Sequence, residues 1–228
     1  MKNNLFLKIY IGLSIIYLLI LFFGYENLDF YLKPVLIPLL GLGVYFHSKF
    51  PSKNILLGAL LFSWIGDVVL LFEGIGEIYF ILGLVAFLIS HIIYCVVFNK
   101  QIKTIRINKA FLFSGSIVIL IYLIGMLSAL LPTLGDLKIP VIVYASVISL
   151  MLFFAFSGLL TWEKPGNQFV FIGAVVFILS DSILAVDKFY NPIQKSSVFI
   201  MSTYLVAQYL IVTGILKLNS NHNQTLEN

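Results

Sequence analysis

Long apolar runs, separated by short polar breaks, follow one another along almost the whole chain. Each run is close to the length of about 20 residues that an α-helix needs to cross the hydrocarbon core of a membrane. None shows the strict alternation that is typical of strands in a transmembrane β-barrel. The pattern therefore predicts an all-α membrane protein, a bundle of about eight transmembrane helices in a single integral-membrane domain over residues 1–228. The predicted spans are 5–23, 31–47, 54–72, 79–98, 110–131, 139–161, 168–186 and 197–216, and a polar tail at 218–228 is expected to fray.

The composition excludes several other classes of protein. Hydrophobic residues make up 61% of the chain and charged residues 11%, whereas a soluble domain has about 25% charged residues. The mean hydropathy is +1.05. These values exclude a soluble globular enzyme, a disordered chain and a nucleic-acid-binding domain. Because Cys95 is the single cysteine, a disulfide framework and a cysteine-based metal cluster are excluded as well, and no metal or cofactor is expected.

The basic residues predict the orientation of the helices. Of the fourteen Lys and Arg residues, ten lie at one end of the predicted spans, which places both termini in the cytoplasm by the positive-inside rule. The expected location is the bacterial inner membrane. The ten residues are Lys2, Lys8, Lys49, Lys53, Lys100, Lys103, Arg106, Lys109, Lys164 and Lys217, and the other four are Lys33, Lys138, Lys188 and Lys195.

Two acidic residues, Asp67 and Asp181, lie inside predicted spans. An intramembrane carboxylate costs about 2.5–3.5 kcal/mol and usually faces a partner or a cavity. Each is five residues from the outer end of its predicted span, so both are expected at one depth, about 7.5 Å below the hydrocarbon edge. Two carboxyl groups in one low-dielectric site leave one protonated and one ionised, as general acid–base hydrolysis requires. Lys33, at the outer start of the second span, is expected slightly above them.

These residues also have structural interpretations. A buried Asp often serves as a hydrogen-bonding contact between helices, and Lys33 can extend to the headgroups. Further candidates for a site lie in the fourth and eighth spans, where interior packing is the alternative to substrate binding. They are His91 and Tyr94, expected on one helix face with Gly83, Phe87 and Phe98, and Tyr204 and Gln208, four residues apart on another.

The surroundings of the two aspartates are similar to each other. In segments 66–71 and 180–185 a small residue precedes Asp, and mainly aliphatic residues follow it. The separation between Asp67 and Asp181 is half the chain length. Duplication of a four-helix unit, with both copies in parallel orientation, would explain this spacing.

The chain resembles the lysoplasmalogenase family, the YhhN-type membrane proteins and their eukaryotic relatives. The resemblance extends over about residues 33 to 208, and the order and spacing of its short motifs make it specific. The motifs are Lys33-Pro34, residues 63–71, residues 80–83 with Phe87, His91 and Tyr94, residues 173–185 followed by Lys188-Phe189, and residues 204–208.

The resemblance implies an eight-span bundle that hydrolyses the vinyl ether bond of lysoplasmalogens. The products would be a fatty aldehyde and glycerophosphoethanolamine or glycerophosphocholine. It also implies that Asp67 and Asp181 are the catalytic pair, and Lys33 at the rim is suited to the phosphate. The substrate-binding candidates are Lys33, His91, Tyr94, Tyr204 and Gln208, and the expected partners are a lysophospholipid with a vinyl ether and the membrane lipids.

Two other functions fit the same pattern. A small lipid or solute transporter would alternate access around the paired aspartates, although few Pro or Gly residues interrupt the spans near them. A non-catalytic membrane scaffold would use the aspartates only to hold helices together. In a scaffold, Asp→Asn substitutions would preserve both fold and function.

Overall fold

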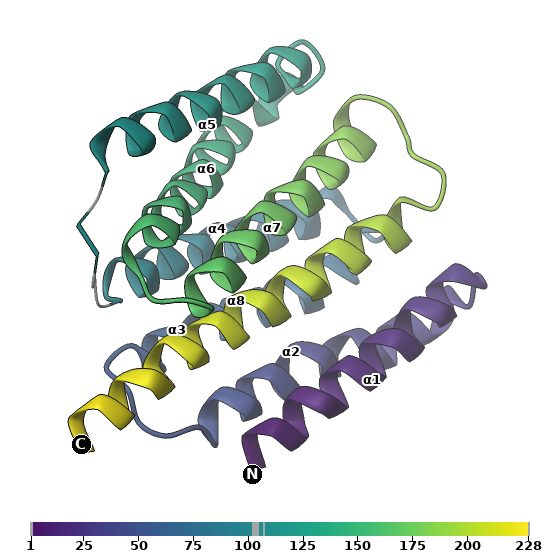
Figure 1. Ribbon diagram of the computed structural model, residues 1–228. Coiled ribbons are helices and arrows are strands. Elements are labelled where there is room, and N and C mark those ends of the chain that lie inside the picture. Colours follow the sequence, from purple (N-terminus) through teal and green to yellow (C-terminus); the bar gives the residue numbers. More distant parts are fainter. Residues whose placement is uncertain (1, 102–104, 107, 228) are drawn as a thin grey trace. The chain divides into compact units, whose positions relative to one another are not determined.

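The computed structural model describes residues 2–101, 105–106 and 108–227. Within these residues the chain forms eight α-helices and two short 3-10 helices, and no strand (Figure 1). The predicted all-α class is confirmed. The α-helices are α1 (Lys2–Phe22), α2 (Asp29–Tyr45), α3 (Lys53–Leu70), α4 (Glu77–Asn99), α5 (Lys109–Leu130), α6 (Lys138–Thr161), α7 (Gly166–Phe189) and α8 (Ser196–Glu227). The 3-10 helices are η1 (Glu26–Leu28), before α2, and η2 (Gly135–Leu137), before α6.

Seven of the described helices are long and apolar enough to cross a membrane, and α2 is the exception. It has 17 residues, which corresponds to about 26 Å of helix, and it contains Pro34 and Pro38. Its shortness agrees with the sequence, where the second apolar run is also the shortest. α8 is longer than its predicted span, because the helix continues from residue 216 through most of the polar segment.

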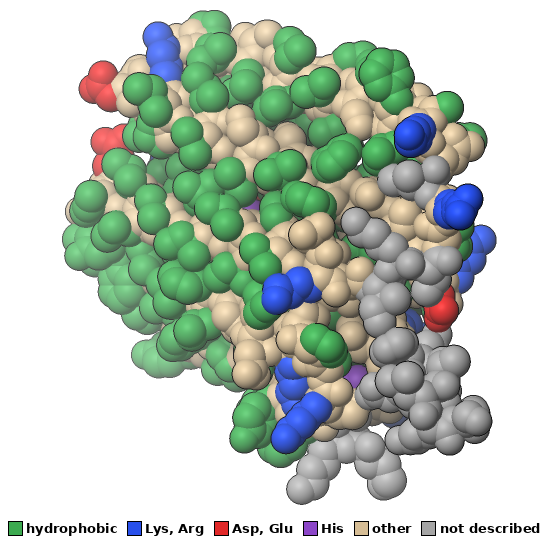
Figure 2. Space-filling view, turned by 90° about the vertical axis from the view of Figure 1, so that its left-hand side faces the viewer, with side chains coloured by type: hydrophobic (Ala, Val, Ile, Leu, Met, Phe, Trp, Pro, Cys, Tyr) green, Lys and Arg blue, Asp and Glu red, His purple; other side chains and the backbone are tan. Residues whose placement is uncertain are grey.

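Large apolar side chains lie exposed on the surface, as expected of helices that face lipid. One face of the protein is covered largely by hydrophobic side chains (Figure 2). On α5 the side chains of Phe113, Val118 and Ile121 are all highly exposed. In a soluble protein such a surface would be an aggregation hazard, whereas the hydrocarbon of a bilayer is its natural solvent. The protein is therefore an integral membrane protein.

The chain divides into two compact units, Met1–Lys100 with α1–α4 and Gln101–Asn228 with α5–α8. In each unit the helices pack in chain order, and the third and fourth helices form the most extensive contact. Asp67 lies on α3 and Asp181 on α7, so the two selected aspartates each lie on the third helix of a unit. This division agrees with the four-plus-four pattern of the sequence, and the duplication itself stays a prediction.

In the first unit, small residues bring α3 and α4 close together. A Cβ atom on Gly66 would lie 2.6 Å from the ring of Phe87, and one on Gly83 would lie 2.6 Å from Leu70. The Ser90 hydroxyl donates to the Ala59 carbonyl oxygen over 2.8 Å. Close approach with hydroxyl-to-backbone bonds is the usual means of association between membrane helices, because lipid gives no hydrophobic driving force.

In the second unit, glycines on both helices allow α7 and α8 to pack against each other. A Cβ atom on Gly173 would lie 2.9 Å from the backbone nitrogen of Ile211, and one on Gly214 would lie 2.8 Å from that of Val170. The Asn167 side chain, in the first turn of α7, donates to the carbonyl oxygen of Leu159 over 2.9 Å and so connects α7 to α6.

The glycine contact predicts the effect of a single methyl group. We expect Gly214→Ala to lower the stability by about 1–3 kcal/mol, because the new Cβ would overlap with backbone atoms that cannot move aside cheaply. Gly125→Ala on α5 is the matched control, since its Cβ would meet nothing within 4 Å. Thermal unfolding in detergent measures both variants. Equal midpoints for the two would contradict the close packing of α7 on α8.

Candidate functional site

Asp67 is buried in the first unit near two tyrosines of α1. The aspartate is 3% exposed, and Tyr10 and Tyr17 are each 1% exposed. Both tyrosines interact electrostatically with Asp67, and Tyr10 does so with Tyr94 of α4 as well. Asp67 and Tyr94, two of the residues selected from the sequence, are thus related through their shared interaction with Tyr10. The sequence analysis did not identify Tyr10 or Tyr17.

Tyr17 also connects this region to the beginning of α2. Its hydroxyl donates to Oδ1 of Asp29 over 2.5 Å. Lys33 follows Asp29 by four residues, so it lies on the same face of α2 one turn further along, and it is half-buried. The lysine thus lies on the helix that Tyr17 holds in place.

The predicted face of α4 is buried as the spacing indicated. Phe87, His91, Tyr94 and Phe98 are all buried, and His91 is completely inaccessible. The Phe87 ring lies against Gly66, the residue before Asp67. This face of α4 therefore forms part of the packing that holds Asp67 in position.

Asp181 in the second unit accepts a hydrogen bond from a tyrosine that the sequence analysis missed. The Tyr144 hydroxyl, from α6, donates to Oδ2 of Asp181 over 2.5 Å. The next residue, Ser182, donates to the Ile178 carbonyl oxygen over 2.6 Å and is also hydrogen-bonded to the hydroxyl of Tyr122 of α5. Helices α5 and α6 therefore both supply tyrosines to the region of α7 that carries Asp181.

Tyr204 and Gln208 lie together on α8, packed against α7. The Gln208 side chain donates to the Tyr204 hydroxyl over 3.4 Å, and both residues are buried. The Tyr204 ring contacts Phe177 edge to face, with centroids 5.5 Å apart. Phe177 precedes Asp181 by one helical turn, so the predicted pair on α8 lies near that part of α7.

The observed helix ends differ from the predicted span ends near both aspartates. Asp67 is three residues before the end of α3 at Leu70, whereas Asp181 is eight residues before the end of α7 at Phe189. The equal depth expected from the spans is therefore not apparent from the helix ends. The equivalence of the two positions rests instead on their place in the third helix of each unit.

Within the part of the chain that the structure describes, no three His, Cys, Asp or Glu side chains gather in a group that could hold a metal ion. The chemical groups near the two aspartates are tyrosine and serine hydroxyls. Such groups donate and accept hydrogen bonds, and a carboxyl group among them is suited to proton transfer.

These features define a polytopic helical membrane protein in which Asp67 and Asp181, on the third helix of each four-helix unit, lie near tyrosine hydroxyl groups. A sequence profile of the YhhN family matches residues 28–215, and the chain belongs to this family.

Curated relatives match over most of the chain. Lysoplasmalogenase TMEM86A from Bos taurus is 33% identical over 187 residues, which is 78% of this chain and 72% of the relative. The Homo sapiens protein of the same name gives the same identity and coverage. Lysoplasmalogenase TMEM86B from Homo sapiens is 30% identical over 185 residues, covering 79% of this chain and 73% of the relative. No solved structure matches the chain.

The hydrogen bond to Asp181 predicts a specific energetic coupling. We expect Tyr144→Phe to lower the stability by about 1–3 kcal/mol, because the half-buried carboxyl group loses its tyrosine donor. In an Asp181→Ala background the same substitution should cost much less, since the acceptor is already gone. Thermal unfolding of the two single variants and the double variant measures the coupling. Tyr190→Phe, at an exposed position, is the control, and its effect on stability should add to that of Asp181→Ala. If the stability losses of Tyr144→Phe and Asp181→Ala also add, the result would contradict the hydrogen bond.

Proposed function

We propose that this protein hydrolyses the vinyl ether bond of lysoplasmalogens within the membrane. The products are a fatty aldehyde and glycerophosphoethanolamine or glycerophosphocholine. The observation that carries this proposal is the similarity to proteins named lysoplasmalogenase, which extends over more than three quarters of the chain. An integral membrane protein is also the appropriate catalyst for a lipid substrate, because the reacting bond lies just beneath the headgroups.

The reaction reaches a hemiacetal through two proton transfers. An acid delivers a proton to the β-carbon of the vinyl ether, which creates an oxocarbenium-like centre at the α-carbon. Water adds to that carbon while a base accepts its proton. The hemiacetal then collapses to the aldehyde as it loses its hydroxyl proton and the departing glycerol oxygen gains one. One carboxylic acid and one carboxylate can perform the first two transfers, and with their protonation states exchanged they can serve the collapse.

We assign the two proton-transfer roles to Asp67 and Asp181, one as acid and one as base. The support for this assignment is chemical. Both are carboxyl groups within membrane helices, where an ionisable residue is expected to be functional. Each also has tyrosine hydroxyls nearby, Tyr10 and Tyr17 for Asp67 and Tyr144 for Asp181, which can orient a carboxyl group.

The other candidates have supporting roles in this proposal. Lys33 binds the substrate phosphate, because its ammonium group is a compact positive charge near the start of α2. Tyr94, through Tyr10, belongs to the surroundings of Asp67. His91, Tyr204 and Gln208 are buried and shape the interior near the substrate.

A carrier for lipids or solutes is the second candidate function. The division of the chain into two four-helix units, with Asp67 on the third helix of one and Asp181 on the third helix of the other, favours it, because many carriers consist of paired repeats. A carrier would bind and move a lipid without breaking a bond, so the two functions are separated by a test for the product.

The decisive test is aldehyde release by the purified protein. Lysoplasmalogen should release aldehyde, whereas the matched 1-acyl and 1-O-alkyl lysophospholipids should not, since neither contains a vinyl ether. A folded protein that releases no aldehyde would refute the proposed activity and leave the carrier as the better account.

Substitution of the aspartates tests the mechanism. We expect Asp67→Asn and Asp181→Asn each to abolish most aldehyde release, and the double variant to be little worse than either, because members of one catalytic unit are strongly non-additive. The wild-type activity should show a bell-shaped dependence on pH, one limb for each macroscopic ionisation.

Both variants should remain folded, because Asn preserves the shape of Asp and removes the ionisable group. Thermal unfolding and gel filtration provide this control. Near-normal turnover by either folded variant would remove that aspartate from the mechanism and assign it a packing role.

A further inference from the structure

A tryptophan fills a gap in the backbone hydrogen bonding of α2. In a regular helix the carbonyl oxygen of Pro34 would accept from the N–H group of residue 38, but residue 38 is proline and has none. The indole nitrogen of Trp64, from α3, donates to this oxygen over 2.8 Å. The bond fixes the Trp64 ring against α2.

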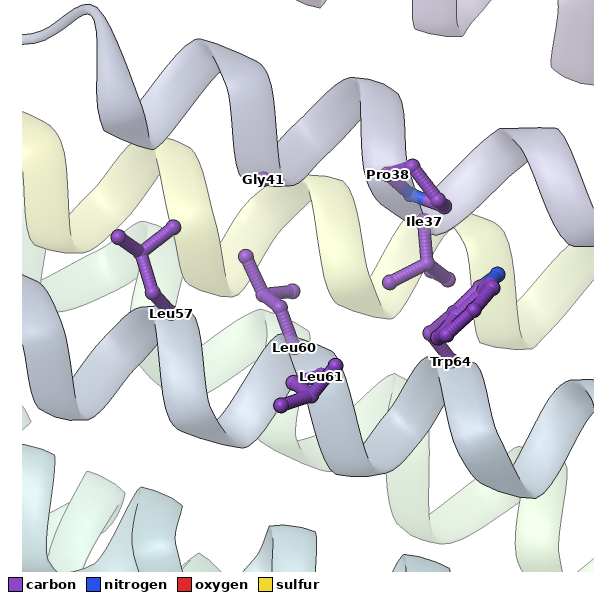
Figure 3. Close-up of a pocket in the computed structure, with 7 residues that line it drawn as sticks. All are labelled: Ile37, Pro38, Gly41, Leu57, Leu60, Leu61 and Trp64. Carbon is purple, nitrogen blue, oxygen red and sulfur yellow. The ribbon is translucent and has the colours of Figure 1, made fainter.

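This ring forms one end of an apolar groove between α2 and α3 (Figure 3). The groove has a volume of about 420 Å³, within the range of pockets that hold small ligands. Ile37, Pro38 and Gly41 form the α2 wall, and leucines line α3. A Cβ atom on Gly41 would meet nothing within 4 Å, so the missing side chain contributes to the hollow.

The groove runs along the two helices. Trp64 contacts Pro34 at one end, Leu60 and Leu61 line the middle with Ile37 and Pro38, and Leu57 lies with Gly41 at the other end. Residue numbers thus rise along α2 as they fall along α3, which means that the helices are antiparallel. From Leu57 to Trp64 the groove extends over about 10 Å of α3.

Polar residues lie beyond both ends of the groove, but among the described residues a carboxyl group lies beyond only one. Asp67 follows Trp64 by three residues on α3, and Lys33 precedes Ile37 by four residues on α2, so each lies on the side of its helix that borders the groove.

The cation at the opposite end is already used by the backbone. Lys53 precedes Leu57 by four residues on α3, and its ammonium group donates to the carbonyl oxygens of Tyr45 and His47 over 2.7 Å. The groove is therefore apolar along its length, and the two ends differ in that a carboxyl group accompanies the cation at the Trp64 end.

We infer that this groove holds the single alkyl chain of a lysophospholipid, with the phosphate at Lys33 and the bond next to the glycerol toward Asp67. The inference rests on the proposed function and identifies Gly41 as the residue that sets chain length. Leu61 is 50% exposed, so a chain can enter sideways from the bilayer. The Trp64 end, where Lys33 lies with Asp67, matches the order of phosphate, glycerol and chain in a lysophospholipid, whereas Lys53 beyond the other end is bonded to backbone carbonyl oxygens.

Gly41→Leu tests the inference by filling the far end of the groove. The matched control is Gly12→Leu on α1, where a Cβ atom also meets nothing within 4 Å and which does not line the groove. Each buried methylene contributes about fourfold to binding, so displacing two or more should lower kcat/KM for the longest lysoplasmalogens by at least about tenfold. Short chains should be unaffected. Lys33→Met should raise KM for all chain lengths alike, since it removes a headgroup contact.

Binding is measured without turnover by fluorescence of Trp64. The probes are 1-O-alkyl lysophosphocholines brominated near the chain terminus or near the glycerol, which have no cleavable vinyl ether. Two variants separate the quenching of Trp64 from that of Trp162. The quenching that is lost in Trp64→Phe belongs to Trp64. If Trp64→Phe does not fold, the quenching that remains in Trp162→Phe gives the same contribution. We expect saturable quenching, which Gly41→Leu weakens for the terminally brominated long chain and Gly12→Leu does not.

The outcomes separate this inference from the proposed function. An unchanged chain-length profile and unchanged quenching in Gly41→Leu would overturn the groove while leaving the hydrolase intact. Equal effects of Gly41→Leu and Gly12→Leu would also overturn it, because they indicate general contact with surrounding lipid. Chain-length-dependent binding without any cleavage would refute the hydrolase and retain the groove as a single-chain lipid site.

Discussion

The cost of placing a carboxyl group among apolar helices determines much of the arrangement in both units. Neither Asp67 nor Asp181 can be hydrated as it would be in water, so hydroxyl groups from neighbouring helices must interact with it. In the first unit these come from α1, and in the second Tyr144 of α6 donates directly to Asp181. Tyrosine suits this purpose, because its ring packs with apolar side chains while its hydroxyl reaches a polar partner. The packing of α1 and α6 thus depends on aspartates carried by other helices.

The residue before each aspartate contacts the fourth helix of its unit. Gly66 lies against Phe87 of α4, and the Ser180 hydroxyl donates to the Ile200 carbonyl oxygen of α8 over 2.9 Å. A small residue at this place lets the fourth helix come close to the turn that carries the aspartate. The small residue before Asp, which appeared in the sequence as one half of a weak repeat, therefore has a physical role in both units.

The sequence predicted the eight helices, because long apolar runs are strong signals. It also selected Asp67 and Asp181 as isolated charges within predicted spans, and their catalytic role stays a prediction. It did not predict the tyrosines, since residues such as Tyr10 and Tyr144 lie in runs that are apolar on all sides. In such a run no periodicity tells which face is buried, and only the packing of other helices selects one. The extent of α8 was missed for another reason. Apolar residues end near 216, but a helix satisfies its own backbone and continues beyond the hydrocarbon.

The groove between α2 and α3 costs the protein little stability in a membrane, which explains how a sequence can maintain it. In a soluble core an empty space of this kind costs stability, because the atoms around it lose contacts. On a lipid-facing surface a hydrocarbon chain fills the space and restores those contacts, so Gly41 and Pro38 carry little packing penalty. Concavity alone therefore does not distinguish a specific site from the surrounding bilayer. The distinction arises at the Trp64 end, where Asp67 accompanies Lys33, whereas the cation at the other end, Lys53, is bonded to backbone carbonyl oxygens. This difference gives the groove a direction that an annular lipid has no reason to match.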